Sequence, residues 1–215
     1  YTMGTEEVIT MENRILEAAK QVFVRKGYEA TKMGDVAAEA GIGRTALHYY
    51  YRTKDMLFDA IFDQLMDSLL PDLGIIIDEK LPFLEKLPKI IERYVNTLQR
   101  NPLFPIFVLN ELQRDPEHIY RSVLKDLPRV EPIMHLHTQL MDEMERGLIK
   151  KMPLYYMATT LISLLVFPML IRNPVTAIFM NGDPGEYDKF LQERIPFVTD
   201  IMIRLLTPDD HTQNK

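Results

Sequence analysis

The chain has 215 residues, of which 47% are hydrophobic and 26% are charged, a composition typical of an ordinary globular protein. It contains no cysteine, which excludes a disulfide framework, a thiolate zinc site and catalysis by a cysteine nucleophile. Its net charge of −6 argues against a protein that coats nucleic acid nonspecifically, because such binding depends on neutralising many phosphates. The first ten residues lack the pattern of a secretory signal, so we expect a cytoplasmic protein.

The charge is unevenly distributed along the chain. Residues 12–60 hold eight Lys or Arg and seven Asp or Glu, a net charge of +1, so the rest of the chain carries −7. A nearly neutral N-terminal segment joined to an acidic body could bind DNA at one end while the body stays clear of it.

The first two predicted helices are separated by a short connection. Over residues 10–26, apolar residues recur every three or four positions, as on one face of an amphipathic helix, and Gly27 stands where a C-terminal cap belongs. Thr31 can serve as the N-cap of a second helix over about 33–40, which Gly41 ends.

Two more helices complete the N-terminal region. A third is predicted over 44–51, and Thr53 can cap a fourth that begins near Lys54 and ends before Pro71. Beyond this point, helices are predicted over residues 82–100, 102–113, 116–126, 129–150, 153–171 and 186–206. Residues 173–185 are predicted to form a loop with at most one turn, and no alternating strand pattern of useful length occurs.

Residues 35–47 have the spacing of a helix-turn-helix. Ala37 is small where two helices would cross, and Gly41 can adopt the positive φ of a tight turn. The residues expected to point inward are Val36, Ala40, Ile42 and Leu47. The outer face of the third helix then presents a cation, a hydroxyl group, a methyl group and two flat rings, which suit base edges and phosphates in a major groove.

Residues 12–60 resemble the DNA-binding domain of the tetracycline-repressor (TetR) family. The residues that carry the resemblance agree in order and spacing: Ile15-Leu16-Glu17-Ala18-Ala19, Phe23, Gly27-Tyr28, Thr31, Val36-Ala37, Ala40-Gly41-Ile42 and Leu47-His48-Tyr49-Tyr50-Tyr51-Arg52-Thr53-Lys54-Asp55-Met56-Leu57. This sequence departs from the family at Gly43, Thr45 and His48, where a serine, a glycine and a tyrosine are more common, so the operator sequence does not follow from the resemblance.

The resemblance implies that the third helix enters the major groove of a double-stranded DNA operator. Tyr50 would then be directed at phosphate, and the starts of the second and fourth helices would meet the DNA backbone. The residues expected to contact DNA are Thr31, Lys32, Met33, Arg44, Thr45, Ala46, His48, Tyr49, Tyr50 and Lys54. A run of three tyrosines also fits half-buried aromatic surface, and short helical hairpins also occur as packing units.

The expected fold is all-α, with two domains. Residues 1–53 would form a three-helix helix-turn-helix domain, and residues 54–215 a helical ligand-binding and dimerisation domain. The resemblance implies a homodimer formed through helices 153–171 and 186–206. It also implies a repressor that a small apolar or amphipathic effector releases from its operator.

The segment from Leu154 to Ile171 contains no charged residue, which places it at the lower limit of a membrane span. Ser163 and Pro168 interrupt this run, and a helix that is apolar on all sides can instead be buried by its own domain and by a second subunit. We therefore favour dimerisation without a membrane partner. A membrane-anchored helical protein that uses residues 154–171 as its span is the alternative.

The middle of the chain is rich in methionine and aromatic residues, which either line an adaptable apolar cavity or form core. The candidates for effector contact are Tyr94, Phe104, Phe107, Asn110, Glu111, His137, Met141 and Tyr155. His135 and His137 point about 200° apart on a helix, so they cannot share a metal ion. We predict no metal site, no cofactor and no enzyme, because the sequence has no phosphate-binding glycine loop and no nucleophile motif.

Overall fold

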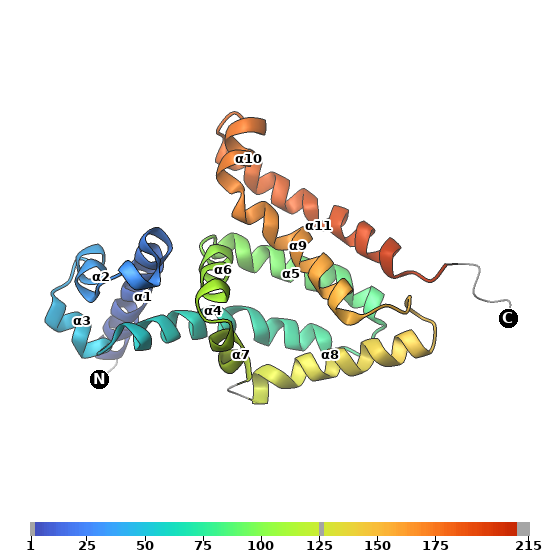
Figure 1. Ribbon diagram of the computed structural model, residues 1–215, viewed down its shortest axis with the longest axis horizontal. Helices are drawn as coiled ribbons and strands as arrows, with labels where there is room; N and C mark the ends of the chain where they lie inside the picture. Colours follow the sequence, from blue (N-terminus) through green and yellow to red (C-terminus); the bar gives the residue numbers. More distant parts are fainter. Residues whose placement is uncertain (1–2, 125–126, 210–215) are drawn as a thin grey trace. The chain divides into compact units, whose positions relative to one another are not determined.

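The computed structural model describes residues 3–124 and 127–209, which form eleven helices and no strand (Figure 1). This confirms the predicted all-α class. The helices are α1 (Met3–Ala30), α2 (Met33–Glu39), α3 (Arg44–Tyr50), α4 (Lys54–Ile77), α5 (Phe83–Arg100), α6 (Phe104–Arg114), α7 (Pro116–Leu124), α8 (Leu127–Glu145), α9 (Leu154–Leu170), α10 (Arg172–Phe179) and α11 (Pro184–Leu206).

The packing of the helices divides the chain into two compact units. Unit 1 comprises Tyr1–Asp67 and Ile106–Val123, and unit 2 comprises Ser68–Pro105 and Leu124–Lys215. Unit 1 therefore contains α1, α2, α3 and the first part of α4, together with most of α6 and α7. Because α4 belongs to both units, packing does not mark a boundary at residue 53, and the division into functional domains stays a prediction.

The core of unit 1 forms where the apolar stripe of α1 packs against its neighbours. Ile15, Ala19 and Val22 of α1 have no exposed surface, and neither do Leu57 and Ile61 of α4. These residues lie three or four positions apart, so each helix presents one continuous apolar face to the other. The amphipathic pattern in the sequence thus places the core correctly.

The connection between α1 and α2 differs from the prediction in one detail. Gly27 has the positive φ of 77° that a C-terminal cap requires, but helical residues continue beyond it to Ala30. The predicted N-cap of α2, Thr31, is wrong, because Lys32 occupies that position. The hydroxyl of Thr31 instead donates a hydrogen bond to the carbonyl of Gly27 over 2.7 Å.

The start of α4 follows the prediction and its end does not. The backbone N–H of Met56 donates to the hydroxyl oxygen of Thr53 over 3.1 Å, which confirms Thr53 as a cap. The helix then passes through Pro71 and ends at Ile77. The expectation that it ends before Pro71 is therefore wrong. Pro71 is exposed within this helix.

Unit 2 is built around α5, which lies along α11 and also contacts α8 and α9. Its interior includes residues of all four helices: Phe83, Leu87, Ile91, Val95, Leu140, Met144, Met157, Leu165, Leu191, Val198 and Met202. Two buried charged side chains in this region have partners. The carboxylate of Glu143 accepts the backbone N–H of Phe83 at 2.9 Å, and the amine of buried Lys86 donates to Gln139 over 2.7 Å.

The segment directly after α9 is helical, so the predicted loop over residues 173–185 is wrong for residues 173–179, while residues 180–183 are not helical. Residues Arg172–Phe179 form α10, and the hydroxyl of Thr176 donates to the carbonyl of Arg172 over 2.8 Å. Pro174 lies in the first turn of α10, where proline is tolerated because its missing N–H leaves no helical hydrogen bond unmade.

The charge-free segment forms a bent pair of helices. Within the described ranges, no single helix is long and apolar enough to cross a membrane, while α9 and α10 together meet that test by length and composition and are bent by 66°. Met157, Leu165 and Pro168 of α9 are buried within unit 2. No observation favours the membrane alternative.

Candidate nucleic-acid interface

A tight turn joins α2 to α3. Gly41 has a φ of 64°, a conformation that glycine adopts without the steric cost that a side chain would add. The backbone N–H of Ile42 donates to the carbonyl of Ala37 over 3.0 Å, and that of Gly41 to Ala38 over 3.1 Å. The turn therefore has the geometry that the helix-turn-helix spacing predicts.

Buried anchors fix the rotation of α3 about its axis. Leu47 has no exposed surface, and Tyr51, one turn later, is 8% exposed. On α2, Val36 and Ala37 are buried against the same interior. Because these anchors face inward, the opposite side of α3 is exposed; its residues are Arg44, Thr45, Ala46, His48 and Tyr49. The burial agrees with the two faces predicted for this helix, while contact with DNA stays a prediction.

Two features shape the exposed face. The guanidinium group of Arg44 lies against Gly34, since a Cβ atom at Gly34 would be 2.9 Å from Arg44 Nε. Tyr49 is 83% exposed, and its ring meets the half-buried ring of Tyr50 edge to face, with 5.4 Å between centroids. A cation and a large aromatic ring therefore stand on the same side of α3, held by neighbouring residues.

The start of α2 is less available to a phosphate than predicted. Thr31 is 2% exposed, and its hydroxyl is already bonded to Gly27. The backbone N–H of Lys32 donates to the carboxylate of Asp35 over 3.1 Å. That bond and the ammonium of Lys26, 3.0 Å away, lower the pKa of Asp35. Lys32 is exposed and Met33 is half-buried, so these two remain the accessible predicted contacts here.

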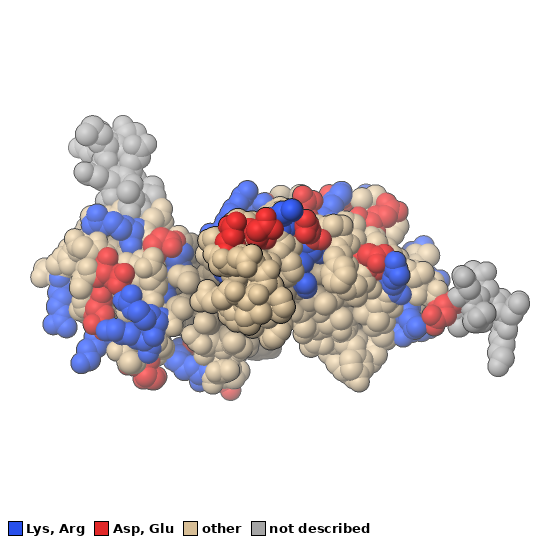
Figure 2. Space-filling model, turned by 90° about the horizontal axis from the view of Figure 1, so that it is seen from above, with Lys and Arg blue, Asp and Glu red and all other residues tan. Residues whose placement is uncertain are grey.

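Lys54 is also occupied within unit 1. Its amine donates to the carbonyl of Tyr28 over 2.8 Å and lies 4.1 Å from the centroid of that ring. Arg44 and Arg52, by contrast, are exposed and form no ion pair with any residue in the described ranges. Figure 2 shows Lys and Arg side chains on the N-terminal helices, at the left, mixed with Asp and Glu.

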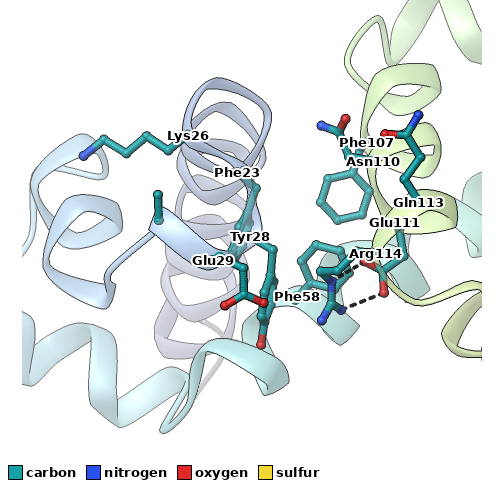
Figure 3. A pocket seen from close by; sticks show the side chains of 12 residues that line it. Phe23, Lys26, Tyr28, Glu29, Phe58, Phe107, Asn110, Glu111, Gln113 and Arg114 are labelled. Atoms are coloured by element: carbon teal, nitrogen blue, oxygen red, sulfur yellow. Dashed lines mark hydrogen bonds and ion pairs between the residues drawn. The ribbon is translucent and has the colours of Figure 1, made fainter.

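The predicted effector contacts fall in different parts of the structure. Phe107, Asn110 and Glu111 line a cavity in unit 1 (Figure 3). Tyr94 packs against the core of unit 2, where burial raises the pKa of its hydroxyl to about 12. The other candidates are either buried, as Phe104 is, or exposed, as are His137, Met141 and Tyr155. Their roles as effector contacts stay predictions.

Sequence reasoning missed His118, which lies between two carboxylates in unit 1. Its Nδ1 is 2.5 Å from Glu111 Oε1 and its Nε2 is 3.0 Å from Asp59 Oδ1, and its side chain is 12% exposed. These groups come from α7, α6 and α4, so no local spacing could have indicated them. Within the part of the chain that is described, no group of three or more His, Asp or Glu side chains could hold a metal ion.

Comparison with known proteins agrees with the geometry of the N-terminal helices. Residues 15–61 match the family described as "Bacterial regulatory proteins, tetR family". The chain is 32% identical to the uncharacterized HTH-type transcriptional regulator YhgD of Bacillus subtilis over 83 residues, which are 39% of this chain and 44% of that relative. It is 43% identical to YfiR of the same organism, also an uncharacterized HTH-type transcriptional regulator, over 25% of this chain and 26% of that relative. The chain thus spans less than half the length of each of these curated relatives.

A solved structure shares the fold over most of the chain. The TetR family transcriptional regulator PfmR from Thermus thermophilus is similar with a TM-score of 0.63 and 20% identity, covering 87% of this chain and 97% of that one. The matched residues 15–61 contain the turn at Gly41 and the anchors of α3. Residues 15–61 thus match the tetR family of bacterial regulatory proteins, and the chain as a whole shares its fold with PfmR.

Proposed function

We propose that this protein is a homodimeric DNA-binding transcriptional regulator whose affinity for its operator is controlled by a small-molecule effector. The observation that carries the proposal is the exposed face of α3. Arg44, Thr45 and Tyr49 are exposed there on a helix whose rotation is fixed by fully buried Leu47. A helix held in this way presents the same backbone positions to DNA, so binding costs only the entropy of ordering its exposed side chains.

The chemistry of this face fits a major groove. Arg44 can donate two hydrogen bonds to the acceptors of a guanine, and the methyl group of Ala46 can contact a thymine methyl. Thr45 and His48 offer short polar groups for base edges, and Tyr49 and Arg52 can reach sugar or phosphate. A single short helix offers few contacts, so tight binding requires two copies of it.

A second copy of the chain would cover an apolar face of unit 2. α9 and α11 contact each other, and each buries one side in the core. Their other sides expose large apolar residues: Tyr155, Tyr156, Ile162, Phe167, Phe197 and Leu205. Soluble monomers rarely expose so many together. Pairing of these helices about a two-fold axis would hold two copies of α3 for half-sites about 34 to 36 Å apart.

Control by an effector requires a physical link between its site and α3. α4 supplies one candidate, because its first part packs in unit 1 and its last part in unit 2. An effector that binds better to one arrangement of α4 than to another would change DNA affinity by the same coupling free energy. Repression by occupying a promoter is the outcome we propose for the free protein.

The test is DNA binding by the full chain to fragments from upstream of its own gene, followed by fluorescence anisotropy. We expect one fragment to bind with a Kd in the nanomolar range, and Arg44→Ala to weaken it by about 1–3 kcal/mol, or roughly 5- to 150-fold. Arg146→Ala is the matched control, since Arg146 is exposed, follows directly after the end of α8, and pairs only with Asp142 among the interactions found for it. Equal loss in both variants, or no specific fragment at low salt, would contradict the proposal.

A further inference from the structure

The last residues of α1 form a short segment to which the starts of α2 and α4 are bonded. The carbonyl of Gly27 accepts the hydroxyl of Thr31 over 2.7 Å, and the carbonyl of Tyr28 accepts the backbone N–H of Thr31 over 3.3 Å. The amine of Lys54, the first residue of α4, donates to the carbonyl of Tyr28 over 2.8 Å and to that of Glu29 over 3.4 Å. Because α3 lies between α2 and α4 in the chain, it is held at both ends by elements that bond to this segment.

The ring of Tyr28 fixes the same segment through its side chain. Two cations cover the ring: the amine of Lys54 lies 4.1 Å from its centroid, and the guanidinium carbon of Arg114 lies 3.8 Å from it. The hydroxyl of Tyr28 donates to the carboxylate of Asp55, and the ring of Phe58 meets it edge to face with 5.1 Å between centroids. Lys54, Asp55 and Phe58 belong to α4, whereas Arg114 supplies a contact from α6.

A buried carboxylate holds Arg114 in place. Its guanidinium group donates two hydrogen bonds to Glu111, over 2.8 and 2.7 Å, drawn as dashed lines in Figure 3. Glu111 is 1% exposed, so breaking this pair would leave a buried charge without its main partner. The same carboxylate lies 2.5 Å from Nδ1 of His118. These contacts hold the guanidinium group against the ring of Tyr28.

The shape of the guanidinium group suits both contacts at once. It can donate through one edge to a carboxylate while its flat face lies on an aromatic ring, whereas the ammonium of a lysine is a compact charge with neither edge nor face. Figure 3 shows this group of Arg114 between Tyr28 of α1 and Glu111 of its own helix. Within the described ranges, no hydrogen bond, ion pair or ring contact found for Arg114 involves a residue of α3.

We propose that Arg114 is a positioning residue for DNA binding. By covering the ring of Tyr28 from α6, it fixes the carbonyls to which Thr31 and Lys54 bond, and through them the exposed face of α3. It acts without contacting DNA. This inference rests on the proposed function, since the affinity that Arg114 controls is the affinity for the operator.

The test measures the affinity of the full chain for its operator fragment at several salt concentrations, by fluorescence anisotropy. Arg114→Lys keeps a positive charge beside Glu111 but lacks the flat fork, and we expect it to weaken binding roughly three- to tenfold. The slope of log Kd against log salt should stay within about 0.5 of the parent value, because loss of a phosphate contact would lower it by about 1. Arg121→Lys is the matched control and should bind within about twofold of the parent. Arg121 is exposed on α7 and pairs with Asp115 and Glu117.

Two further variants test whether the effect passes through the ring of Tyr28. Tyr28→Leu removes the ring but keeps the backbone carbonyls, and it should weaken binding at least as much as Arg114→Lys does. Tyr28→Phe keeps the ring and should bind at least about threefold more tightly than Tyr28→Leu. With Tyr28→Leu already present, Arg114→Lys should weaken binding by less than about twofold more, because the contact it disturbs is gone.

Melting curves confirm that each variant folds, and if Arg114→Lys does not, the two Tyr28 variants decide the inference. Equal operator affinity in Arg114→Lys and the parent chain would overturn it, as would equal affinity in Tyr28→Leu and Tyr28→Phe. A salt slope lower by about 1 would show that Arg114 contacts phosphate itself. Additive losses in the doubly substituted chain would show that it acts by a route other than the ring.

Amide hydrogen exchange separates this inference from the proposed function, because it needs no DNA. The backbone N–H of Thr31 should exchange faster in Arg114→Lys than in the parent chain or in Arg121→Lys, and exchange at the parent rate would overturn the inference. If no DNA fragment binds to the parent chain, the proposed function fails, while exchange at Thr31 still decides whether Arg114 fixes this segment. If DNA binds normally and Arg114→Lys behaves as the parent in both measurements, only the positioning role is wrong.

Discussion

α3 and α9 expose opposite kinds of surface. α3 buries Leu47 completely and presents polar and aromatic groups, whereas α9 exposes Tyr155, Ile162 and Phe167 to 62, 53 and 57% while it buries Met157 and Leu165. Polar groups on the surface are satisfied by water, but large apolar groups exposed together favour another apolar surface. The exposed face of α3 therefore suits a nucleic acid, and the exposed face of α9 suits another apolar protein surface.

The two surfaces differ in whether they need a second copy of the chain. The exposed face of α3 is complete in one chain, because its anchors and its outward groups belong to the same three helices. The face of α9 and α11 would be covered by the second copy of the chain that we propose, and its apolar sequence fits both a membrane span and a dimer interface. Variants that affect one surface and spare the other test this distinction.

The largest effect is expected from Phe167→Glu, which places a charge in the proposed dimer interface. Because a two-fold interface contains the residue twice, loss of two buried phenylalanines costs about 3–6 kcal/mol of association free energy, or more than 100-fold in Kd. Analytical ultracentrifugation should show a monomer where the parent chain is a dimer. Ile75→Glu is the control, as Ile75 is equally apolar, 68% exposed and on α4. Dimers in both variants would mean that the apolar face has another purpose.

Leu47→Ala comes next and removes the anchor of α3. A fully buried leucine truncated to alanine costs about 2–5 kcal/mol, depending on how far the site collapses. We expect a lower urea midpoint and loss of operator binding, with the dimer preserved. Ala46→Gly, on the exposed face one residue earlier, should lower stability by no more than about 1 kcal/mol. Similar urea midpoints for the two variants would show that Leu47 does not fix α3.

Local spacing explains why the faces of α3 could be predicted. Leu47 and Tyr51 are one helical turn apart, and Gly41 marks the turn before them, so the outward residues follow without knowledge of the rest of the fold. The cap at Thr53 could be predicted for the same reason. α10 was missed because Pro174 fits either a loop or a first helical turn, and only its packing against α11 decides between them.

The environment of His118 and the cavity could not be predicted. His118 meets Asp59 and Glu111, which are 59 and 7 residues away in sequence, and the cavity joins residues of α1, α4 and α6. Three of its lining residues were singled out for their chemistry alone, and nothing in the sequence separated them from Tyr94 or Met141. Thr31 and Lys54 were expected at phosphate, yet their polar atoms bond to the carbonyls at the end of α1.

A smaller effect is expected in the interior of unit 2, where buried Tyr94 should make the protein less stable at alkaline pH. Burial raises the pKa of Tyr94 to about 12 from the ordinary value of 10.0, so the unfolded chain loses its proton first as the pH rises. The stability that Tyr94 contributes is complete below pH 10 and is lost between pH 10 and about 12, by about 2–3 kcal/mol. In Tyr94→Phe, the free energy of unfolding should depend less on pH between pH 10 and about 12. Urea titrations at a series of pH values measure it. The same slope in both proteins would show that Tyr94 is not the cause.

The smallest effect tests whether DNA recognition by α3 can change while stability does not. Gly34→Ala adds a Cβ that would lie 2.9 Å from Arg44 Nε, so the guanidinium group must move, which a long flexible side chain can do. Alanine is also favoured over glycine in a helix by up to about 1 kcal/mol, so the melting temperature should stay equal or rise slightly. Operator affinity should nevertheless fall a few-fold, because Arg44 loses its preferred position.

Gly43→Ala is the matched substitution for that comparison, since a Cβ at Gly43 has nothing within 4 Å and Arg44 is not displaced. Its operator affinity should stay close to that of the parent chain. If Gly34→Ala also leaves the affinity unchanged, Arg44 reads DNA from a different rotamer, and its position against Gly34 belongs to the free protein alone. If both variants weaken binding equally, the loss comes from the helix-turn-helix backbone, and recognition would depend on the turn more than on the exposed face of α3.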